Sequence, residues 1–190
     1  KTVIGIDPAT NIVSAINDPR ITIINDFFTK NVAQYIISTH GHVDMVVANN
    51  VFAHIPDIQG ITHSICDVLS DDGVFIFEVH YLGNVINEFQ YDMIYHEHLY
   101  YYSLLSAMKH FEAYEMIVFD VKSVPIHAGS MRFYVCKKGS KHGFKVSPAV
   151  IKLQNEELAK LFHKPETFAR FAEEIAKRKS ILMALLKKLK

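Results

Sequence analysis

Histidine, carboxylate and phenol side chains are concentrated in one short segment of this sequence. Residues 91–102 (YDMIYHEHLYYY) contain two histidines, two acids and five tyrosines. Histidine is the natural general base near neutral pH, and carboxyl and phenol groups complete an acid–base pair. If residues 95–98 are extended, Tyr95 and Glu97 share one face while His96 and His98 share the other. We therefore expect this segment to aim a base, an acid and a phenol at one small molecule.

Short apolar runs predict the elements that must position this segment. Buried strands are expected at residues 3–6, 21–24, 45–48 and 74–79, the last after a turn signal at 70–73. Helix-length mixtures at 30–38 and 57–69 lie between strands, and this alternation predicts an α/β fold with a parallel sheet covered on both faces. Two later runs, 116–124 and 131–136, are joined by a short connection, which predicts an antiparallel pair.

Polar residues lie at or just past the predicted strand ends: Asp7, Asp26, Asn49 and His80. In open α/β sheets ligands bind at the carboxyl ends of the strands, so these residues are candidates for a ligand site. A carboxylate such as that of Asp7 can accept from both hydroxyls of a ribose. Asp-Pro also caps strands and starts turns, so a purely structural role for Asp7 stays open.

The end of the chain is expected to be helical from Pro148, in two segments divided at Lys164 and Pro165. A 3,4 spacing in the second segment predicts one apolar stripe, formed by Phe168, Phe171, Ile175, Leu182, Leu185 and Leu189. Packing of this stripe against the main domain is favoured over an oligomer seam, because the stripe is short. The oligomeric state expected is a monomer or a weak oligomer.

Composition excludes several classes of partner. The chain has 190 residues with 49% hydrophobic and 21% charged side chains, and its formal net charge is zero. Such a balance gives no bulk attraction to nucleic acid or to an anionic membrane. No apolar run is long enough for a membrane span, and Cys66 and Cys136 lie in apolar settings typical of buried free thiols. A cytoplasmic location is therefore expected.

Five segments, taken in order, resemble one enzyme family. They are GIDP (5–8), NNVFAHIPD (49–57), GVFIFEV (73–79), YDMIYHEH (91–98) and VPIHAGSMR (124–132). Together they resemble the S-adenosylmethionine-dependent sugar C-methyltransferases, which methylate a carbon beside the ketone of a nucleotide-linked deoxysugar. The resemblance implies a Rossmann-like class I methyltransferase sheet, mostly parallel with an antiparallel strand at one edge, and S-adenosyl-L-methionine as cofactor.

The resemblance also implies a domain organisation. Residues 1–147 would form the methyltransferase core with an inserted substrate segment at about 81–102, and 148–190 a helical extension. Family members carry a zinc-binding domain and a glycine-rich cofactor loop before this region and an α/β domain after it. We expect the chain to be a fragment that lacks these parts, with the sheet left open where its first strand would lie.

By position, the family assigns cofactor roles to four residues. Asp7 would hold the ribose, Asp26 and Phe27 would border the adenine, and Asn49 would line the cofactor pocket.

On the substrate side, the resemblance places His54, Tyr95, Glu97 and His98 in the active site. A carbon–hydrogen bond beside a ketone is weakly acidic, so its methylation needs a base and donors for the enolate oxygen. His98 is the expected base, Tyr95 and His54 would donate to the oxyanion, and Glu97 would orient the sugar or His98.

Two alternatives remain open at this point. His96 and His98, with His80 as a third ligand, could hold a metal, although the preferred interpretation needs none. A non-catalytic remnant that binds sugar nucleotides is the other. Two residues are left without a firm role: His127 could reach the site or support a turn, and Arg132 could pair with a nucleotide phosphate or a surface acid.

Overall fold

The computed structural model describes residues 2–141 and 144–189. The strands are β1 (Val3–Ile6), β2 (Ile21–Ile24), β3 (Val43–Asn49), β4 (Leu69–His80), β5 (Met116–Val124) and β6 (Ser130–Lys137). The α-helices are α1 (Thr10–Val13), α2 (Lys30–His40), α3 (Ile58–Val68), α4 (Leu82–Asn87), α5 (Leu104–Glu112), α6 (Pro148–Ala159) and α7 (Pro165–Leu189). Two short 3-10 helices, η1 (Phe52–His54) and η2 (Tyr91–Met93), complete the order.

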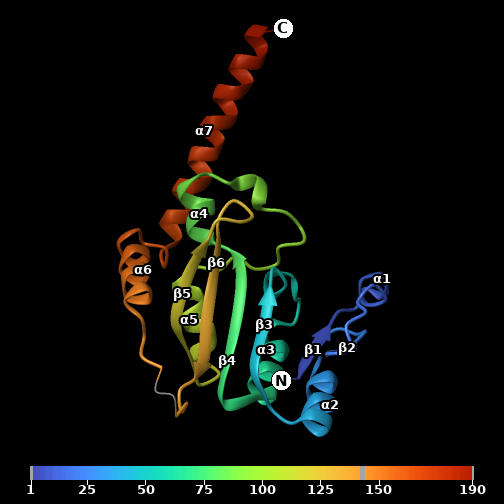
Figure 1. Ribbon diagram of the computed structural model, residues 1–190. Helices are drawn as coiled ribbons and strands as arrows, with labels where there is room; N and C mark the ends of the chain where they lie inside the picture. Colours follow the sequence, from blue (N-terminus) through green and yellow to red (C-terminus); the bar gives the residue numbers. More distant parts are fainter. Residues whose placement is uncertain (1, 142–143, 190) are drawn as a thin grey trace.

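The strands form two sheets, side by side in Figure 1. One pairs β1 with β2 in parallel, and the other has the order β3-β4-β6-β5. β3 and β4 are parallel, whereas β6 is antiparallel to both of its neighbours. The predicted α/β class and the antiparallel pair are confirmed, except that the antiparallel strand lies one position in from the edge. The expected cover on both faces of the sheet is wrong at β3, where Met45 and Val47 are more than half exposed. Among the described residues β1 and β3 are not paired, so the sheet is open between them.

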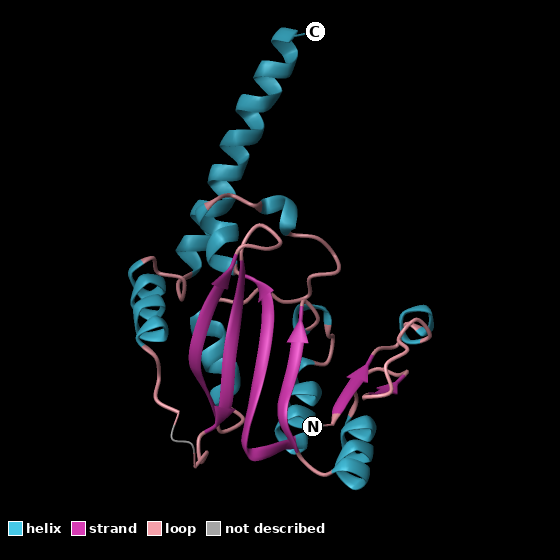
Figure 2. Ribbon diagram, in the orientation of Figure 1, coloured by secondary structure: helices cyan, strands magenta, loops and turns pink. Residues whose placement is uncertain are grey.

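Aromatic side chains fill the core between the four-stranded sheet and the helices α3 and α5, which lie behind it in Figure 2. Phe75 and Phe77 of β4 are buried and alternate with the half-buried Val74 and Ile76, so both reach the same face of the sheet. Phe77 stacks on Phe133 of β6 with ring centroids 4.7 Å apart, and Phe52 of η1 packs against Phe77 at 4.9 Å. Because Phe52 is fully buried here, the core fixes the 3-10 turn that carries His54.

The polar residues 70–73 do not form a separate turn before β4. They lie inside it, because β4 pairs with β3 both at Val43 with Leu69 and again at Met45 with Val74, and the chain bulges between these points. Lys137 anchors the start of β4 by donating from Nζ to the Leu69 carbonyl at 2.8 Å. The prediction of a turn at 70–73 was therefore wrong, and the strand is longer than its apolar run.

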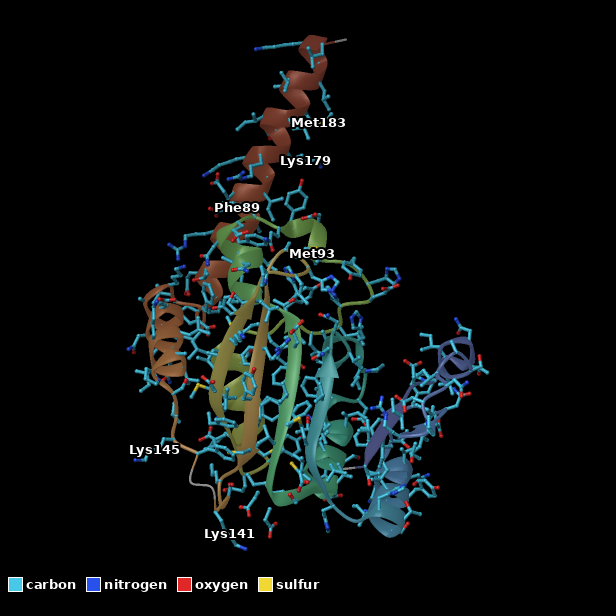
Figure 3. The ribbon with its side chains drawn as sticks, viewed as in Figure 1. Phe89, Met93, Lys141, Lys145, Lys179 and Met183 are labelled. Atoms are coloured by element: carbon cyan, nitrogen blue, oxygen red, sulfur yellow. The ribbon has the colours of Figure 1, made fainter. Side chains whose placement is uncertain are left out.

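Within the part of the chain that the structure describes, α7 packs on its surroundings through its first half and through Arg178 in its middle. Phe171 stacks on Phe89 at 6.1 Å, and the Arg178 guanidinium lies 4.0 Å above the same ring. Farther along, Leu182 and Leu185 are each 52% exposed, so the favoured prediction of a packed stripe is wrong for this half. Figure 3 shows the part that carries Lys179 and Met183 projecting beyond the domain. Among the described residues, no helix is long and apolar enough to cross a membrane.

Candidate functional site

After β4 ends at His80, residues 81–102 form a loop that contains the histidine-rich segment 91–102. The end of this loop returns beside its first residue. Tyr81 and Tyr102 form an isolated bridge, and the Leu82 amide donates to the Tyr102 carbonyl at 3.0 Å. Both tyrosines are buried in the aromatic core. The loop between them, with α4 and η2, is thus held at its base over the carboxyl ends of β3 and β4 (Figure 1).

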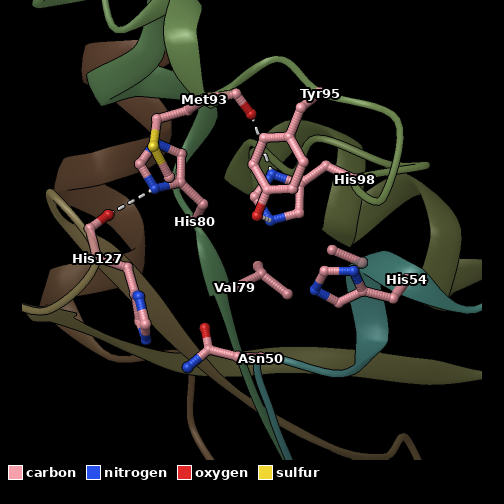
Figure 4. A pocket seen from close by; sticks show the side chains of 9 residues that line it. Asn50, His54, Val79, His80, Met93, Tyr95, His98 and His127 are labelled. Atoms are coloured by element: carbon pink, nitrogen blue, oxygen red, sulfur yellow. Dashed lines mark hydrogen bonds between the residues drawn. The ribbon is translucent and has the colours of Figure 1, made fainter.

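A cavity of about 120 Å³ lies beneath this loop (Figure 4). Its walls come from the end of β3, η1, the end of β4, the loop, and the β5–β6 connection; the lining residues are Asn50, Ala53, His54, Val79, His80, Met93, Tyr95, His98 and His127. Ligand pockets commonly measure roughly 300–1,000 Å³. The cavity therefore suits the reacting end of a small molecule rather than a whole nucleotide sugar.

The cavity brings Tyr95 and His98 together, contrary to the expectation of an extended segment. Residues 95–98 form a turn, in which the His98 amide donates to the Tyr95 carbonyl at 3.1 Å. This folds the two side chains onto one side, with the Tyr95 hydroxyl 3.0 Å from His98 Nε2. The prediction that Tyr95 and His98 lie on opposite faces was wrong, because it assumed strand geometry.

The tautomer of His98 follows from its other nitrogen. Nδ1 lies 3.1 Å from the Met93 carbonyl, which can only accept, so Nδ1 carries the hydrogen. In the neutral ring Nε2 then holds a lone pair, which accepts from the Tyr95 hydroxyl. Burial lowers the pKa of His98, helped by the nearby His54 and His80, against the opposing effects of the Met93 bond and Glu97. His98 is therefore favoured as a neutral base.

His54 faces the same cavity from η1. Its ring centroid is 5.0 Å from that of His98, and its Nδ1 donates to the Glu97 carbonyl at 2.8 Å. The Glu97 residue is exposed and does not line the cavity. The structure thus unites three of the four predicted active-site residues, while Glu97 takes part through its main chain.

The described residues do not assemble ligands for the metal site considered from the sequence. His96 is exposed and does not line the cavity, although His98 does. Within residues 2–141 and 144–189, no group of three or more histidine, cysteine or acidic side chains is arranged to hold a metal ion.

Four lining residues had no role predicted from the sequence, and His80 and His127 had no firm one; the four are Asn50, Ala53, Val79 and Met93. Asn50 and Met93 lie in segments that resemble the family, but no role of their own was predicted; Asn50 directly follows a strand end and has a φ of 53°. His80 was considered only as a strand-end polar group or metal ligand. His127 does reach the cavity. Arg132 pairs with Glu78, a buried acid rather than a surface one, with 2.7 Å between Nη2 and Oε2.

The residues predicted to hold the cofactor lie at the carboxyl ends of β1, β2 and β3. Asp7 Oδ1 accepts from the Ala9 amide at 2.7 Å, and Asp26 Oδ1 accepts from the Phe27 amide at 2.7 Å. Each carboxylate keeps a second oxygen that bonds to no described residue. The Phe27 ring is 67% exposed beside them, and Asn49 is exposed at the end of β3. Carboxylates for hydroxyls and an aromatic face for a base fit a nucleoside cofactor.

Comparisons with known proteins show similarity to methyltransferases. Residues 1–115 match a family model described as a methyltransferase domain, and residues 125–190 match one described as a C-methyltransferase C-terminal domain. C-methyltransferase NovU of Streptomyces niveus is 36% identical over 155 residues, which are 82% of this chain and 36% of that protein. The chain thus spans little more than a third of that relative.

Solved structures share the fold. A methyltransferase of Listeria monocytogenes described as S-adenosylmethionine dependent has a TM-score of 0.54 at 11% identity, covering 72% of this chain and 80% of that one. A Haloferax volcanii complex of the Trm112 methyltransferase activator with a methyltransferase gives a TM-score of 0.52 at 14% identity, covering 72% of both chains.

Proposed function

This chain belongs to the S-adenosylmethionine-dependent C-methyltransferases, and from that premise we propose that it methylates a carbon next to the ketone of a nucleotide-linked deoxysugar. His98 serves as the general base. The observation that carries this proposal is the state of His98: its hydrogen is committed to the Met93 carbonyl, and its lone pair lies in the cavity. A base is what carbon methylation requires, whereas a hydroxyl or amine acceptor already has a lone pair of its own.

The cavity residues divide the proton chemistry among them. The acidic carbon of the substrate takes the place of the Tyr95 hydroxyl at His98 Nε2, and the proton moves from that carbon to the ring. The displaced hydroxyl is then free to donate to the enolate oxygen that forms. His54 keeps its Nδ1 hydrogen on the Glu97 carbonyl, so its neutral ring offers only an acceptor to a sugar hydroxyl. It can donate to the oxyanion only as an imidazolium.

The cofactor would be held at the neighbouring strand ends. When bound, S-adenosylmethionine supplies an activated methyl group that the enolate carbon can take without further acid or base. Asp7 would accept from the ribose hydroxyls, Asp26 and Phe27 would border the adenine, and Asn49 would line the pocket. The loop formed by residues 81–102 would cover the cavity and keep water from the enolate.

We expect Asp7→Asn in the full-length protein to weaken S-adenosylhomocysteine binding by about 10- to 100-fold, since bonds to a charged group contribute about 1.5–3 kcal/mol. Isothermal titration calorimetry measures this directly. Asp44→Asn, at an exposed position inside β3, is the matched control and should bind normally. Unchanged affinity in Asp7→Asn would show that this carboxylate only supports its turn.

The proposed substrate class has its own test. With a radiolabelled methyl donor, the full-length protein should label a nucleotide-linked keto-deoxysugar and leave the corresponding alcohol unlabelled, because only the ketone acidifies the neighbouring carbon. Equal labelling of both sugars would indicate methylation at oxygen and would overturn the proposal.

A further inference from the structure

The side chain of His80 is buried at the end of β4, and both ring nitrogens face oxygen atoms. Nδ1 lies 2.8 Å from the His127 carbonyl, and Nε2 lies 3.0 Å from Gln90 Oε1 (Figure 4 shows the first contact). A neutral imidazole has one hydrogen and can satisfy only one of these acceptors. The geometry therefore calls for a proton on each nitrogen.

The orientation of the Gln90 amide decides this point, because a reversed amide would present a donor to His80 instead. Its Nε2 donates to Glu88 Oε2 at 2.7 Å and to the Ala128 carbonyl at 3.0 Å. Reversal would place an oxygen against both of these acceptors. The amide is thus fixed with its oxygen toward His80, and the Glu88 carboxylate stands behind it as a countercharge.

The β5–β6 connection is shaped to supply these acceptors. His127, Ala128 and Gly129 all have positive φ, at 50°, 57° and 103°. The first two are strained for residues with a Cβ, and strain of this kind persists where the surrounding structure imposes it. Their consecutive carbonyls accept from the His80 ring and the Gln90 amide, and the Gly129 carbonyl accepts from the Tyr81 amide at 3.3 Å.

Gly129 is required for this arrangement. A Cβ at this position would collide with the side-chain amide of Asn84, which itself donates to the Gly129 carbonyl at 3.3 Å. The connection is therefore built to approach the end of β4 and α4 closely. Its three acceptors converge on the residues around His80.

We propose that His80 is held as an imidazolium and is the fixed positive charge of the cavity, which keeps the base His98 unprotonated and favours the negative charge of the enolate. The two rings lie 6.4 Å apart and nearly parallel, with an interplanar angle of 19°. Both hydrogens of His80 are committed to protein acceptors, so it acts through its charge, which disfavours a proton on Nε2 of His98. It is a positioning residue, and its catalytic role rests on the proposed function.

Other titratable groups face this pair. Those around His98 are His54 from η1, His80 from β4, and Tyr95, Glu97 and Tyr101 from its own segment. Those around His80 are His98, His127 and, through Gln90, Glu88. Among these groups, His80 is the one whose two ring nitrogens both face acceptors, and these acceptors stabilise its positive charge.

The first test reads the protonation of His80 itself. Nitrogen-15 NMR of histidine side chains in the full-length protein at pH 7.5 should show both ring nitrogens of His80 protonated, with only Nδ1 protonated in His98. His80→Gln assigns the signals. Gln90→Leu, which removes one acceptor and keeps the ring, should abolish the Nε2 proton. A neutral His80 in the parent protein overturns the inference, whether or not the protein methylates a sugar.

The second test measures the effect of the His80 charge on the pKa of His98. Removing a positive charge raises the pKa of His98, so the acid limb of the methyl-transfer pH profile in His80→Gln should move up by about one pH unit. His63→Gln, an exposed histidine of α3, should leave the limb in place. A loss of rate equal at every pH would mean that His80 is only structural. If the parent protein transfers no methyl group, the proposed function fails while the NMR result still decides the charge.

Discussion

His98→Gln should lower the rate of methyl transfer by about 10²- to 10⁴-fold in the full-length protein, the range attributed to general bases. Glutamine can still hydrogen-bond, but it has no lone pair basic enough to take a proton from carbon. Nδ1 of His98 is committed to Met93 and its pKa is lowered mainly by burial, so the parent ring is neutral and competent. Single-turnover rates with labelled cofactor measure the loss.

The neighbouring His96→Gln is the matched control, since His96 is exposed outside the cavity. It should retain the parent rate. Because the pKa of His98 lies below the ordinary value, the parent rate should hold as the pH falls toward 6.5 and decline only below it. Full methyl transfer by His98→Gln would mean that another group, with His54 the nearest histidine, removes the proton.

Glu157→Ala should lower the free energy of unfolding by about 3–5 kcal/mol. Glu157 is 1% exposed on α6, and its carboxylate accepts three hydrogen bonds. Oε1 accepts from the Tyr81 hydroxyl at 2.8 Å and the Leu104 amide at 2.7 Å, and Oε2 accepts from the Leu105 amide at 2.8 Å. Alanine would leave two amides at the start of α5 and one phenol without their acceptor.

The same carboxylate has a functional consequence. It ties α6 to the N-terminus of α5, where negative charge is favourable, and to Tyr81 at the base of the cavity loop. Burial, followed by the charge of Glu157, raises the pKa of the Tyr81 phenol, which therefore stays a donor. Loss of Glu157 should thus loosen the loop as well as the helix.

Urea unfolding of the full-length protein measures this loss in the free energy of unfolding. Glu156→Ala is the control, because Glu156 is 51% exposed and its pair with Lys152 spans 3.9 Å. Such a surface pair contributes about 0–1 kcal/mol. A Glu157→Ala protein within about 1 kcal/mol of its parent would show that α5 and Tyr81 find other partners.

Much of the fold could be predicted from local patterns. The runs at Val3–Ile6 and Ile21–Ile24 form strands with the predicted bounds. The expectation that they are buried was wrong, since all their residues are half-buried or exposed and Val3 is 51% exposed. The start of β4 could not be predicted, since its pairing with Val43 depends on a partner 26 positions away rather than on local turn propensity. The exposed half of α7 shows the same limit: periodicity predicts an apolar stripe but not what covers it.

The candidate site was predicted in part. The family resemblance, not local pattern, brought His54 together with the histidine-rich segment. The turn at 95–98 was missed because alternating residue types mimic a strand, and only the turn joins Tyr95 to His98. The charge of His80 could not be predicted at all, since it depends on carbonyls of a connection 47 positions away in a left-handed conformation.

Solvent exchange at the substrate carbon tests the central claim most directly. With S-adenosylhomocysteine in place of the methyl donor, the full-length protein should exchange one proton beside the ketone of the nucleotide-linked sugar for deuterium in heavy water, as followed by proton NMR. His98→Gln should not catalyse this exchange. Two results would contradict the account. One is exchange at the parent rate in His98→Gln, and the other is methyl transfer by the parent protein without any measurable proton exchange beside the ketone.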